Sequence, residues 1–281
     1  MAKKIKKKIG DKTKNRLLHR LTEQIRTHKK AFTLYVVLRV MVIVILVLSA
    51  LNGNFENVFL CALTLALFLI PSFVELNFHI QLPDTLEIVV FLFIFAAEIL
   101  GEISSFYTRI PIWDTMLHTV NGFLAAAIGY SMVDLLNRND KFALSLSPKY
   151  LALMSFCFSM TIGVLWEFFE FGMDMLFATD MQKDYIITQI NTVLVHPEGL
   201  NKVIHIPVDS LTVNGEDWVA KYGGYLDIGL IDTMKDLLVN FIGAVVFSII
   251  GYFHTKSRGK NELARQFIMV PTEQKETRTK E

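Results

Sequence analysis

The chain has 281 residues, of which 52% are hydrophobic and 20% are charged, and its mean hydropathy is +0.41. This composition excludes a disordered or collagen-like chain and disfavours an ordinary soluble domain. The charges nearly balance at 28 basic and 27 acidic residues, but twelve of the basic side chains fall within residues 1–30.

Residues 1–30 are predicted to form a basic cytoplasmic segment. Its apolar residues lie among lysines and arginines at spacings typical of an amphipathic helix on a membrane surface: Ile5, Ile9, Leu17, Leu21 and Ile25. We expect this segment to contact anionic lipid headgroups. Nucleic acid is not an expected partner.

Six apolar runs follow, and each is long enough to cross the hydrocarbon core of a bilayer, which takes about 20 residues. A backbone that crosses lipid must satisfy its own hydrogen bonds, so each run is expected to be helical. The sequence therefore predicts an all-α fold, a polytopic six-helix transmembrane bundle surrounded by membrane lipids. The runs are about 31–50, 56–75, 86–105, 115–136, 151–178 and 231–253.

The basic residues in short connections predict the orientation of the bundle, because lysine and arginine concentrate on the cytoplasmic side. Connection 137–150 and the segment after residue 253 carry several of them, whereas connection 51–55 has none. Both termini are therefore expected in the cytoplasm, and 254–281 is predicted to be a mostly disordered cytoplasmic tail.

Residues 179–230 are then expected to form an extracytoplasmic loop. Two of its stretches, YIITQINTVLV (185–195) and VIHIPV (203–208), are rich in β-branched residues, and VNGED (213–217) contains an Asn-Gly turn signal. This pattern predicts a small β-hairpin inserted between the fifth and sixth helices.

Polar residues within the apolar runs are the strongest indication of function, because an ionised side chain near the bilayer centre costs about 2.5–3.5 kcal/mol or more. Four runs carry them at spacings of three, four, seven or eight residues, which share one helix face. The predicted topology places all four stripes in the outer half of the bundle. They are Glu98 and Glu102; Asp114 and His118; Glu167, Glu170 and Asp174; and Asp232, Asp236 and Asn240.

Eight carboxylates against Arg109, Lys235 and the imidazole of His118 repel too strongly for all of them to be ionised in a low-dielectric site. Either several are protonated, or the site binds a divalent metal ion. Oxygen ligands with one imidazole suit Mg²⁺, Mn²⁺, Fe²⁺ or Zn²⁺.

Within this hypothesis the residues take three roles. The metal ligands are predicted to be Glu167, Glu170, Asp174, Asp232 and Asp236. The catalytic residues are predicted to be Asp114, His118 and Glu167, with Glu98, Glu102 and Asn240 in support. Purely structural roles stay open as alternatives. Asp114 and Asp232 are also suited to cap the N-termini of helices, and His118 is also suited to a buried position in the core. Four glycines are expected to allow close helix approach: Gly122, Gly163, Gly172 and Gly243.

The segments WDTMLHTVNGF, GVLWEFFEFGMD and LIDTMKDLLVNFIGA carry a family resemblance. In this order they resemble the YjdF-like family of small bacterial inner-membrane proteins over about residues 85–253, and more loosely the VanZ-like membrane proteins. The resemblance implies a multi-pass protein of the bacterial plasma membrane and supplies no activity. It implies that the following positions are its signature: Asp114, His118, Glu167, Glu170, Asp232, Asp236 and Asn240.

Three functions compete at this point. The first is a metal-dependent membrane enzyme that acts on a lipid or lipid-linked substrate at the outer face. The second is a cation- or proton-coupled transporter whose acids bind the moving ion. The third is a non-catalytic scaffold or sensor in which polar side chains only hold helices together.

Overall fold

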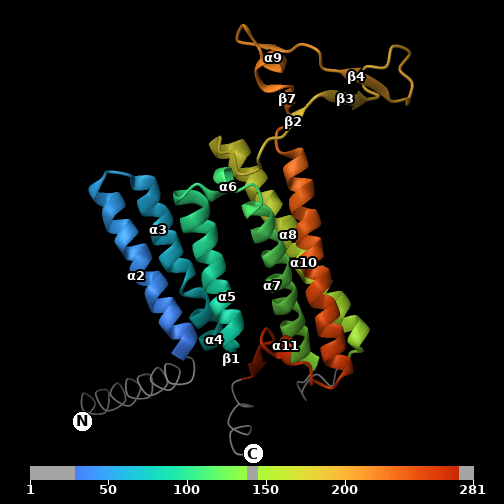
Figure 1. The fold of residues 1–281 in the computed structure, drawn as a ribbon. Helices are drawn as coiled ribbons and strands as arrows, with labels where there is room; N and C mark the ends of the chain where they lie inside the picture. Colours follow the sequence, from blue (N-terminus) through green and yellow to red (C-terminus); the bar gives the residue numbers. More distant parts are fainter. Residues whose placement is uncertain (1–28, 138–144, 272–281) are drawn as a thin grey trace, which may run out of the picture.

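The computed structural model describes residues 29–137 and 145–271, so most of the basic segment 1–30 lies outside the described residues. The described chain is mostly helical, with short strands (Figure 1). Five of its helical segments are long and apolar enough to cross a membrane, and they coincide with five of the six predicted runs. These are Lys30–Leu51, Phe55–Phe78, Trp113–Asn137, Pro148–Phe177 and Leu230–Lys256.

The first two segments form an antiparallel pair. Helix α2 (Lys29–Leu51) is followed by α3 (Phe55–Leu67), whose first turn is capped by the Asn54 side chain accepting from the Asn57 backbone N–H at 3.1 Å. The run predicted as one helix is divided, since a second helix, α4 (Ile70–Phe78), begins after a break. Pro71 lies in its first turn, where its missing N–H is tolerated.

The third predicted run forms one continuous helical segment that begins as an α-helix and ends as a π-helix. Helix α5 (Asp84–Phe95) passes directly into a π-helix, η1 (Ala96–Ile103). The Ser104 N–H donates to the Ile99 carbonyl at 3.0 Å, which closes the last turn five residues back. The π-helix carries Glu98 and Glu102, and π-helical turns in proteins occur frequently at functional sites. A short helix, α6 (Phe106–Arg109), leads to the next segment.

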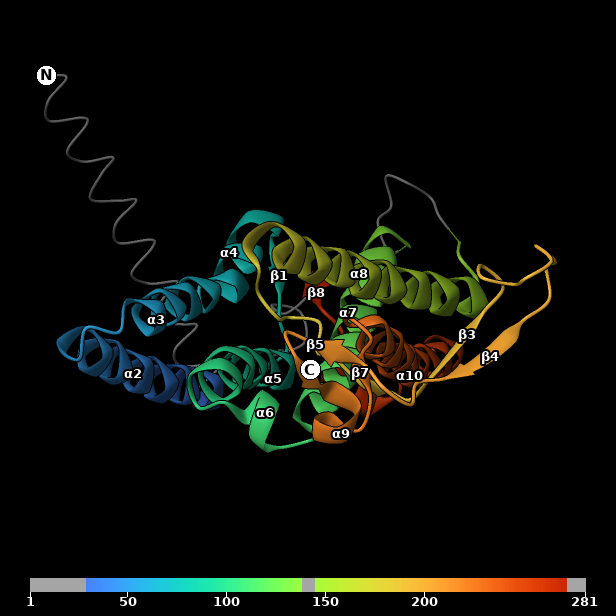
Figure 2. The same cartoon turned by 90° about the horizontal axis from the view of Figure 1, so that it is seen from above.

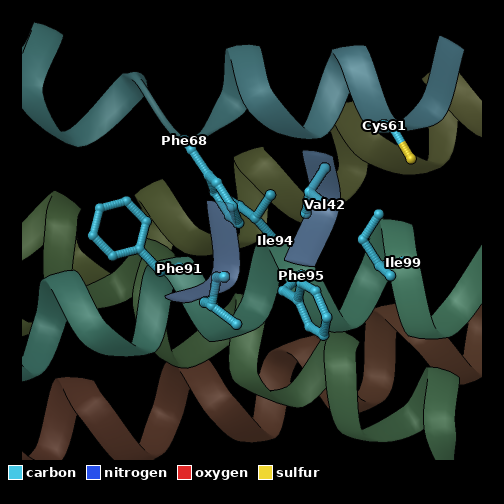
Figure 3. Close-up of a cluster of buried hydrophobic side chains, with 8 residues drawn as sticks. Val42, Cys61, Phe68, Phe91, Ile94, Phe95 and Ile99 are labelled. Atoms are coloured by element: carbon cyan, nitrogen blue, oxygen red, sulfur yellow. The ribbon is translucent and has the colours of Figure 1, made fainter. Parts of the chain in front are cut away.

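The helices form two groups, which Figures 1 and 2 show side by side. Helices α2, α3 and α5 make one group, and α7 (Trp113–Asn137), α8 (Pro148–Phe177) and α10 (Leu230–Lys256) make the other. The first group packs around large apolar side chains (Figure 3). Within this cluster the rings of Phe68 and Phe91 meet edge to face at 5.6 Å. The buried members are Leu38, Val42, Cys61, Phe68, Phe91, Ile94, Phe95 and Ile99.

The second group packs through small residues. A Cβ placed at Gly122 would collide with the backbone of Asn240, and one at Gly243 would lie 2.7 Å from the Phe123 backbone nitrogen. Gly163 is equally crowded, by the Asn240 side chain at 2.6 Å. These three glycines confirm the expected close approach of α7, α8 and α10. Gly172 departs from the expectation, because nothing lies within 4 Å of a Cβ placed there.

The two groups are joined at the end where α2 begins. Strand β1 (Ile80–Gln81) pairs antiparallel with β8 (Val270–Pro271), which follows α10 and the short helix α11 (Glu262–Arg265) (Figure 1). Met269 lies buried with Leu82, Leu86 and Leu124 from both groups. The segment predicted to be a disordered tail is therefore folded as far as residue 271, and residues 272–281 lie outside the described part.

At the opposite end stands the insertion between α8 and α10 (Figure 1). It holds three two-stranded pairs and the short helix α9 (Trp218–Tyr222). The two predicted β-rich stretches pair with each other as β3–β4, and the Asn-Gly turn lies between β5 and β6, where Asn214 and Gly215 both have positive φ. The pairs are β2 (Ile186–Ile187) with β7 (Tyr225–Leu226), β3 (Gln189–Thr192) with β4 (Ile204–Pro207), and β5 (Thr212–Val213) with β6 (Glu216–Asp217).

Candidate functional site

Helix α7 supplies the histidine of the site. Asp114 lies in its first turn and His118 one turn later, so both side chains share one face. The His118 Nε2 atom is 3.6 Å from the Asp114 Oδ1 atom, and His118 is only 8% exposed.

Helix α8 supplies two glutamates on its inward face. Glu167 and Glu170 are three residues apart and are both buried, at 4% and 7% exposure. The Trp166 indole N–H donates to the Glu170 Oε1 atom at 2.8 Å, which fixes that carboxyl group.

Helix α10 completes the arrangement with Asp236, which is 3% exposed. Its Oδ2 atom lies 3.7 Å from the same His118 Nε2 atom that faces Asp114. The other ring nitrogen, Nδ1, lies 4.0 Å from the Glu167 Oε1 atom. The imidazole therefore stands between carboxyl groups on opposite ring edges, contributed by three helices.

These five side chains, Asp114, His118, Glu167, Glu170 and Asp236, are called the carboxylate–histidine cluster below. They form two overlapping sets whose nitrogen and oxygen atoms lie within 4.8 Å of one another, and His118 is common to both. One set is Asp114, His118 and Asp236, and the other is His118, Glu167 and Glu170.

One buried oxygen of the cluster has no hydrogen-bond donor of normal geometry among the described residues. It is the Glu167 Oε2 atom, although the Gln182 and Thr233 side chains lie near this carboxyl group. A buried polar atom without a partner costs about 1–3 kcal/mol, and more when it is charged. Proteins retain such an atom where it binds something else or where strain serves a function.

Asp174 and Asp232, predicted as metal ligands, belong to neither set. The Asp174 carboxylate accepts the backbone N–H groups of Met181 and Gln182 at 2.7 and 2.8 Å. The Asp232 carboxylate accepts the backbone N–H of Lys183 at 2.7 Å. Both carboxylates thus hold the chain that enters the insertion.

Asn240 lies next to the cluster on α10 and is 1% exposed. Its Nδ2 group donates to the Ser159 carbonyl at 3.4 Å, and its Oδ1 atom accepts from the Asn121 amide at 3.4 Å. This one side chain on α10 thus contacts both α7 and α8.

Glu98 and Glu102 are not brought into the two sets. Glu98 is half-buried and Glu102 is exposed on η1. The Tyr107 ring packs against Gly101 of the same π-helix. Burial raises the pKa of the Tyr107 hydroxyl, and so do the carboxylates of Glu102 and Asp114, so this phenol stays protonated.

Three neighbours of the site were not among the predicted residues. Besides Tyr107, they are Gln182 and Thr233: the Gln182 amide donates to the Thr233 hydroxyl at 2.6 Å, which links the insertion to α10. In the sequence, the position of Thr233 next to Asp232 is the signal that could have identified it, and nothing distinguished Gln182 as a neighbour of the site.

Comparison with known proteins places this arrangement in context. The family model described as "Predicted membrane protein (DUF2238)" matches residues 34–257, which include every helix of the site. A protein of Thermotoga maritima described as an uncharacterized protein is 28% identical over 104 residues. That alignment covers 37% of this chain and 52% of the relative, so about half of the relative's length is matched. No solved structure matches.

Proposed function

We propose that this chain, which belongs to the DUF2238 family of predicted membrane proteins, is a membrane-embedded, metal-dependent enzyme. Its site is the carboxylate–histidine cluster, and its substrate is a lipid or lipid-linked molecule reached from the outer leaflet. The unpartnered Glu167 Oε2 atom carries this proposal, because a bound cation satisfies a buried carboxylate oxygen that no described residue satisfies.

The donor set fits a divalent ion. Four carboxyl groups and one imidazole offer the oxygen and nitrogen ligands that Mg²⁺, Mn²⁺, Fe²⁺ and Zn²⁺ accept. Trp166 orients Glu170 from behind, as a hydrogen bond to a ligating carboxylate does. When bound, the ion would polarise a phosphoryl or acyl oxygen and lower the pKa of a water molecule.

The side chains around the ion then divide the remaining tasks. Glu167, Glu170 and Asp236 would hold the ion. Asp114 orients the His118 ring through its Nε2 edge, and His118 takes or returns a proton during the reaction. Asp174 and Asp232 keep the entry of the insertion over the site, where it limits access of water.

The proposed topology has six crossings. The α5–η1 segment, Asp84–Ile103, adds a sixth crossing to the five long apolar segments, which explains why α2 begins and α10 ends at the same end of the bundle (Figure 1). The basic residues Lys149, Lys256 and Arg258 lie at that end, which favours the cytoplasm for it. The insertion is then extracytoplasmic, and the membrane is the bacterial plasma membrane.

A stationary ion is favoured over a transported one by the residues on the cytoplasmic side of the cluster. The Ser159 hydroxyl donates to the Gly122 carbonyl and the Ser155 hydroxyl to the Ala126 carbonyl, both at 2.7 Å. These hydroxyls hold α8 against α7, so they are engaged in packing and are not free to pass an ion along the bundle axis.

The first test is metal binding by the purified full-length protein. After removal of adventitious metal, Mn²⁺ and Zn²⁺ are titrated separately and bound metal is counted by mass spectrometry of the eluted ions. We expect stoichiometric binding that Glu167→Gln and Asp236→Asn each weaken by about 10-fold or more. Asp217→Asn is the matched control, because that carboxylate caps α9 in the insertion.

The second test addresses catalysis. Proteoliposomes of phosphatidylglycerol and phosphatidylethanolamine are incubated with and without the bound metal, and headgroup and acyl-chain release are followed by mass spectrometry. Metal-dependent release that disappears in Glu167→Gln supports an enzyme. Sub-stoichiometric metal throughout about pH 6 to 8, where a divalent site should load, contradicts the proposal. Cation flux across the vesicles, lost in Glu167→Gln, replaces the enzyme with a transporter.

A further inference from the structure

A second binding feature lies on the outer surface of α8 and α10, at the opposite end of these helices from the cluster. It is a groove of about 560 Å³, within the range of about 300–1,000 Å³ typical of small-molecule sites. Nearly all of its exposed lining is apolar. Its apolar walls are Ala152, Leu153 and Phe156 from α8 and Val245, Ile249 and Phe253 from α10.

The groove opens toward the surroundings of the bundle. Leu153, Ile249 and Phe253 are each about half exposed, at 53%, 52% and 52%. Both helices are among the segments long and apolar enough to cross a membrane, so a bilayer around them places hydrocarbon chains against this groove.

One end of the groove is basic. Lys149, in the first turn of α8, lines it directly, and the Lys256 Nζ atom lies 5.7 Å from the ring centre of Tyr252, which lines it from α10. Both lysines are exposed, and neither forms an ion pair with another described residue. Tyr150 follows Lys149 on α8, and Tyr252 lines the groove together with Lys149; tyrosines are enriched where hydrocarbon meets headgroups.

We propose that this groove binds one phospholipid with an anionic headgroup, from the leaflet at the end where α8 begins. An acyl chain lies along the apolar wall, and Lys149 and Lys256 bind the headgroup phosphate. These observations favour a lipid as the occupant. The apolar lining of the groove leads to two lysines without an ion-pair partner among the described residues, just as the acyl chains of a phospholipid lead to its charged headgroup. A helix from another protein would leave the two ammonium groups unpaired unless it brought acids to that level.

The experiment is native mass spectrometry of the full-length protein in detergent, titrated in parallel with phosphatidylglycerol and phosphatidylcholine of identical chains. Removing a lysine near a membrane surface costs about 1 kcal/mol, or about fivefold in affinity. We therefore expect wild type to prefer phosphatidylglycerol, and the double substitution Lys149→Ala with Lys256→Ala to weaken its binding by about 25-fold. Lys202→Ala, an exposed lysine in the insertion, is the charge control.

A second variant tests the acyl chain separately from the headgroup. Ala152→Trp fills the groove and should weaken both lipids equally, while Ala62→Trp, on the exposed face of α3, should change neither. Thermal unfolding of each variant shows whether it is folded as wild type is. Equal binding of the two lipids by wild type overturns the proposal, as does unchanged binding in Ala152→Trp. A dimer that Ala152→Trp dissociates, with no lipid preference, assigns the groove to a second copy of the chain.

Discussion

The two helix groups bury different kinds of side chain. In the group of α2, α3 and α5, aromatic and branched apolar residues fill the interior, and Tyr35, Phe68 and Phe91 meet ring against ring. In the group of α7, α8 and α10, glycine, alanine and serine lie at the contacts, and the acids are buried beside them. Large rings are buried in both groups, since Tyr130 and Phe247 are fully buried in the second, but among the described residues the buried acids lie only in the second group.

The difference follows from the solvent. Lipid is as apolar as leucine, so burying an apolar side chain between membrane helices gains little from transfer, and contact area and hydrogen bonds decide stability. Small residues let α7 and α10 approach until backbone meets backbone at Gly122 and Gly243. This contact makes a stiff frame, which a cluster of mutually repelling carboxyl groups needs if they are to stay together.

The largest expected loss of stability comes from adding a methyl group where the backbones of α7 and α10 are in contact. Gly243→Ala places a Cβ against the backbone of α7, which cannot rotate away as a side chain can. We expect a loss of about 3 kcal/mol, at the upper end of overpacking costs. Unfolding in mixed micelles measures it. Gly172→Ala is the control on α8, where space is open; a loss of similar size there would contradict a packing explanation.

An intermediate loss of stability is expected from a substitution in the group of α2, α3 and α5. Phe91→Ala removes a ring that is 2% exposed and leaves a cavity, while the gain from transfer to lipid largely cancels. The cavity cost of about 24 cal/mol per Å³ then predicts a loss of about 2 kcal/mol. The same unfolding assay measures it, and metal binding by the cluster should be unchanged. A loss of metal binding would mean that the two groups are not independent.

A smaller effect is expected from one hydrogen bond between helices. The Ser155 hydroxyl donates across to α7, whereas the Thr161 hydroxyl donates within α8 to the Cys157 carbonyl at 2.9 Å. Ser155→Ala should cost about 0.6 kcal/mol, the average for hydrogen bonds between membrane helices. Thr161→Val should cost less, because no helix contact depends on it. Equal losses would remove the distinction between packing and local bonds.

The smallest expected effect concerns the stability of the insertion, which connects α8 and α10 of the second helix group. Partial burial raises the pKa of the Asp184 carboxyl, and so do the nearby carboxylates of Asp180 and Asp227. The folded insertion therefore binds this proton more tightly than the unfolded chain does, and its stability falls as the pH rises through the raised pKa. Asp184→Asn should remove that slope. Amide hydrogen exchange at Tyr185, whose N–H donates to Asp227, reports it.

The sequence predicted the parts of this structure that depend on one helix at a time. Spacing alone placed Asp114 with His118 and Glu167 with Glu170, because residues three and four apart share a helix face. The length of apolar runs located the spanning segments to within a few residues. The break between α3 and α4 was missed, although Pro71 marked it, because Pro71 lies within an otherwise continuous apolar run.

What the sequence did not reveal depends on which elements meet. Asp174 and Asp232 carry the same chemistry as Glu167 and lie on the same helix faces as the cluster, but the chain entering the insertion returns to them and supplies backbone N–H groups. Glu98 and Glu102 satisfy the same spacing rule, but η1 continues α5 in the other helix group. Periodicity assigns a face to a helix and says nothing about its neighbours.

The pairing of β1 with β8 sets an order of events during synthesis. Strand β1 leaves the ribosome before α7, α8 and α10, whereas its partner emerges after all of them. The first helix group is therefore synthesised with its strand β1 unpaired, and β1 can pair only after residues 270–271 have been translated. Stalling the ribosome before Val270 should therefore leave the β1 edge without its partner strand, while α5 and η1 still contact α7.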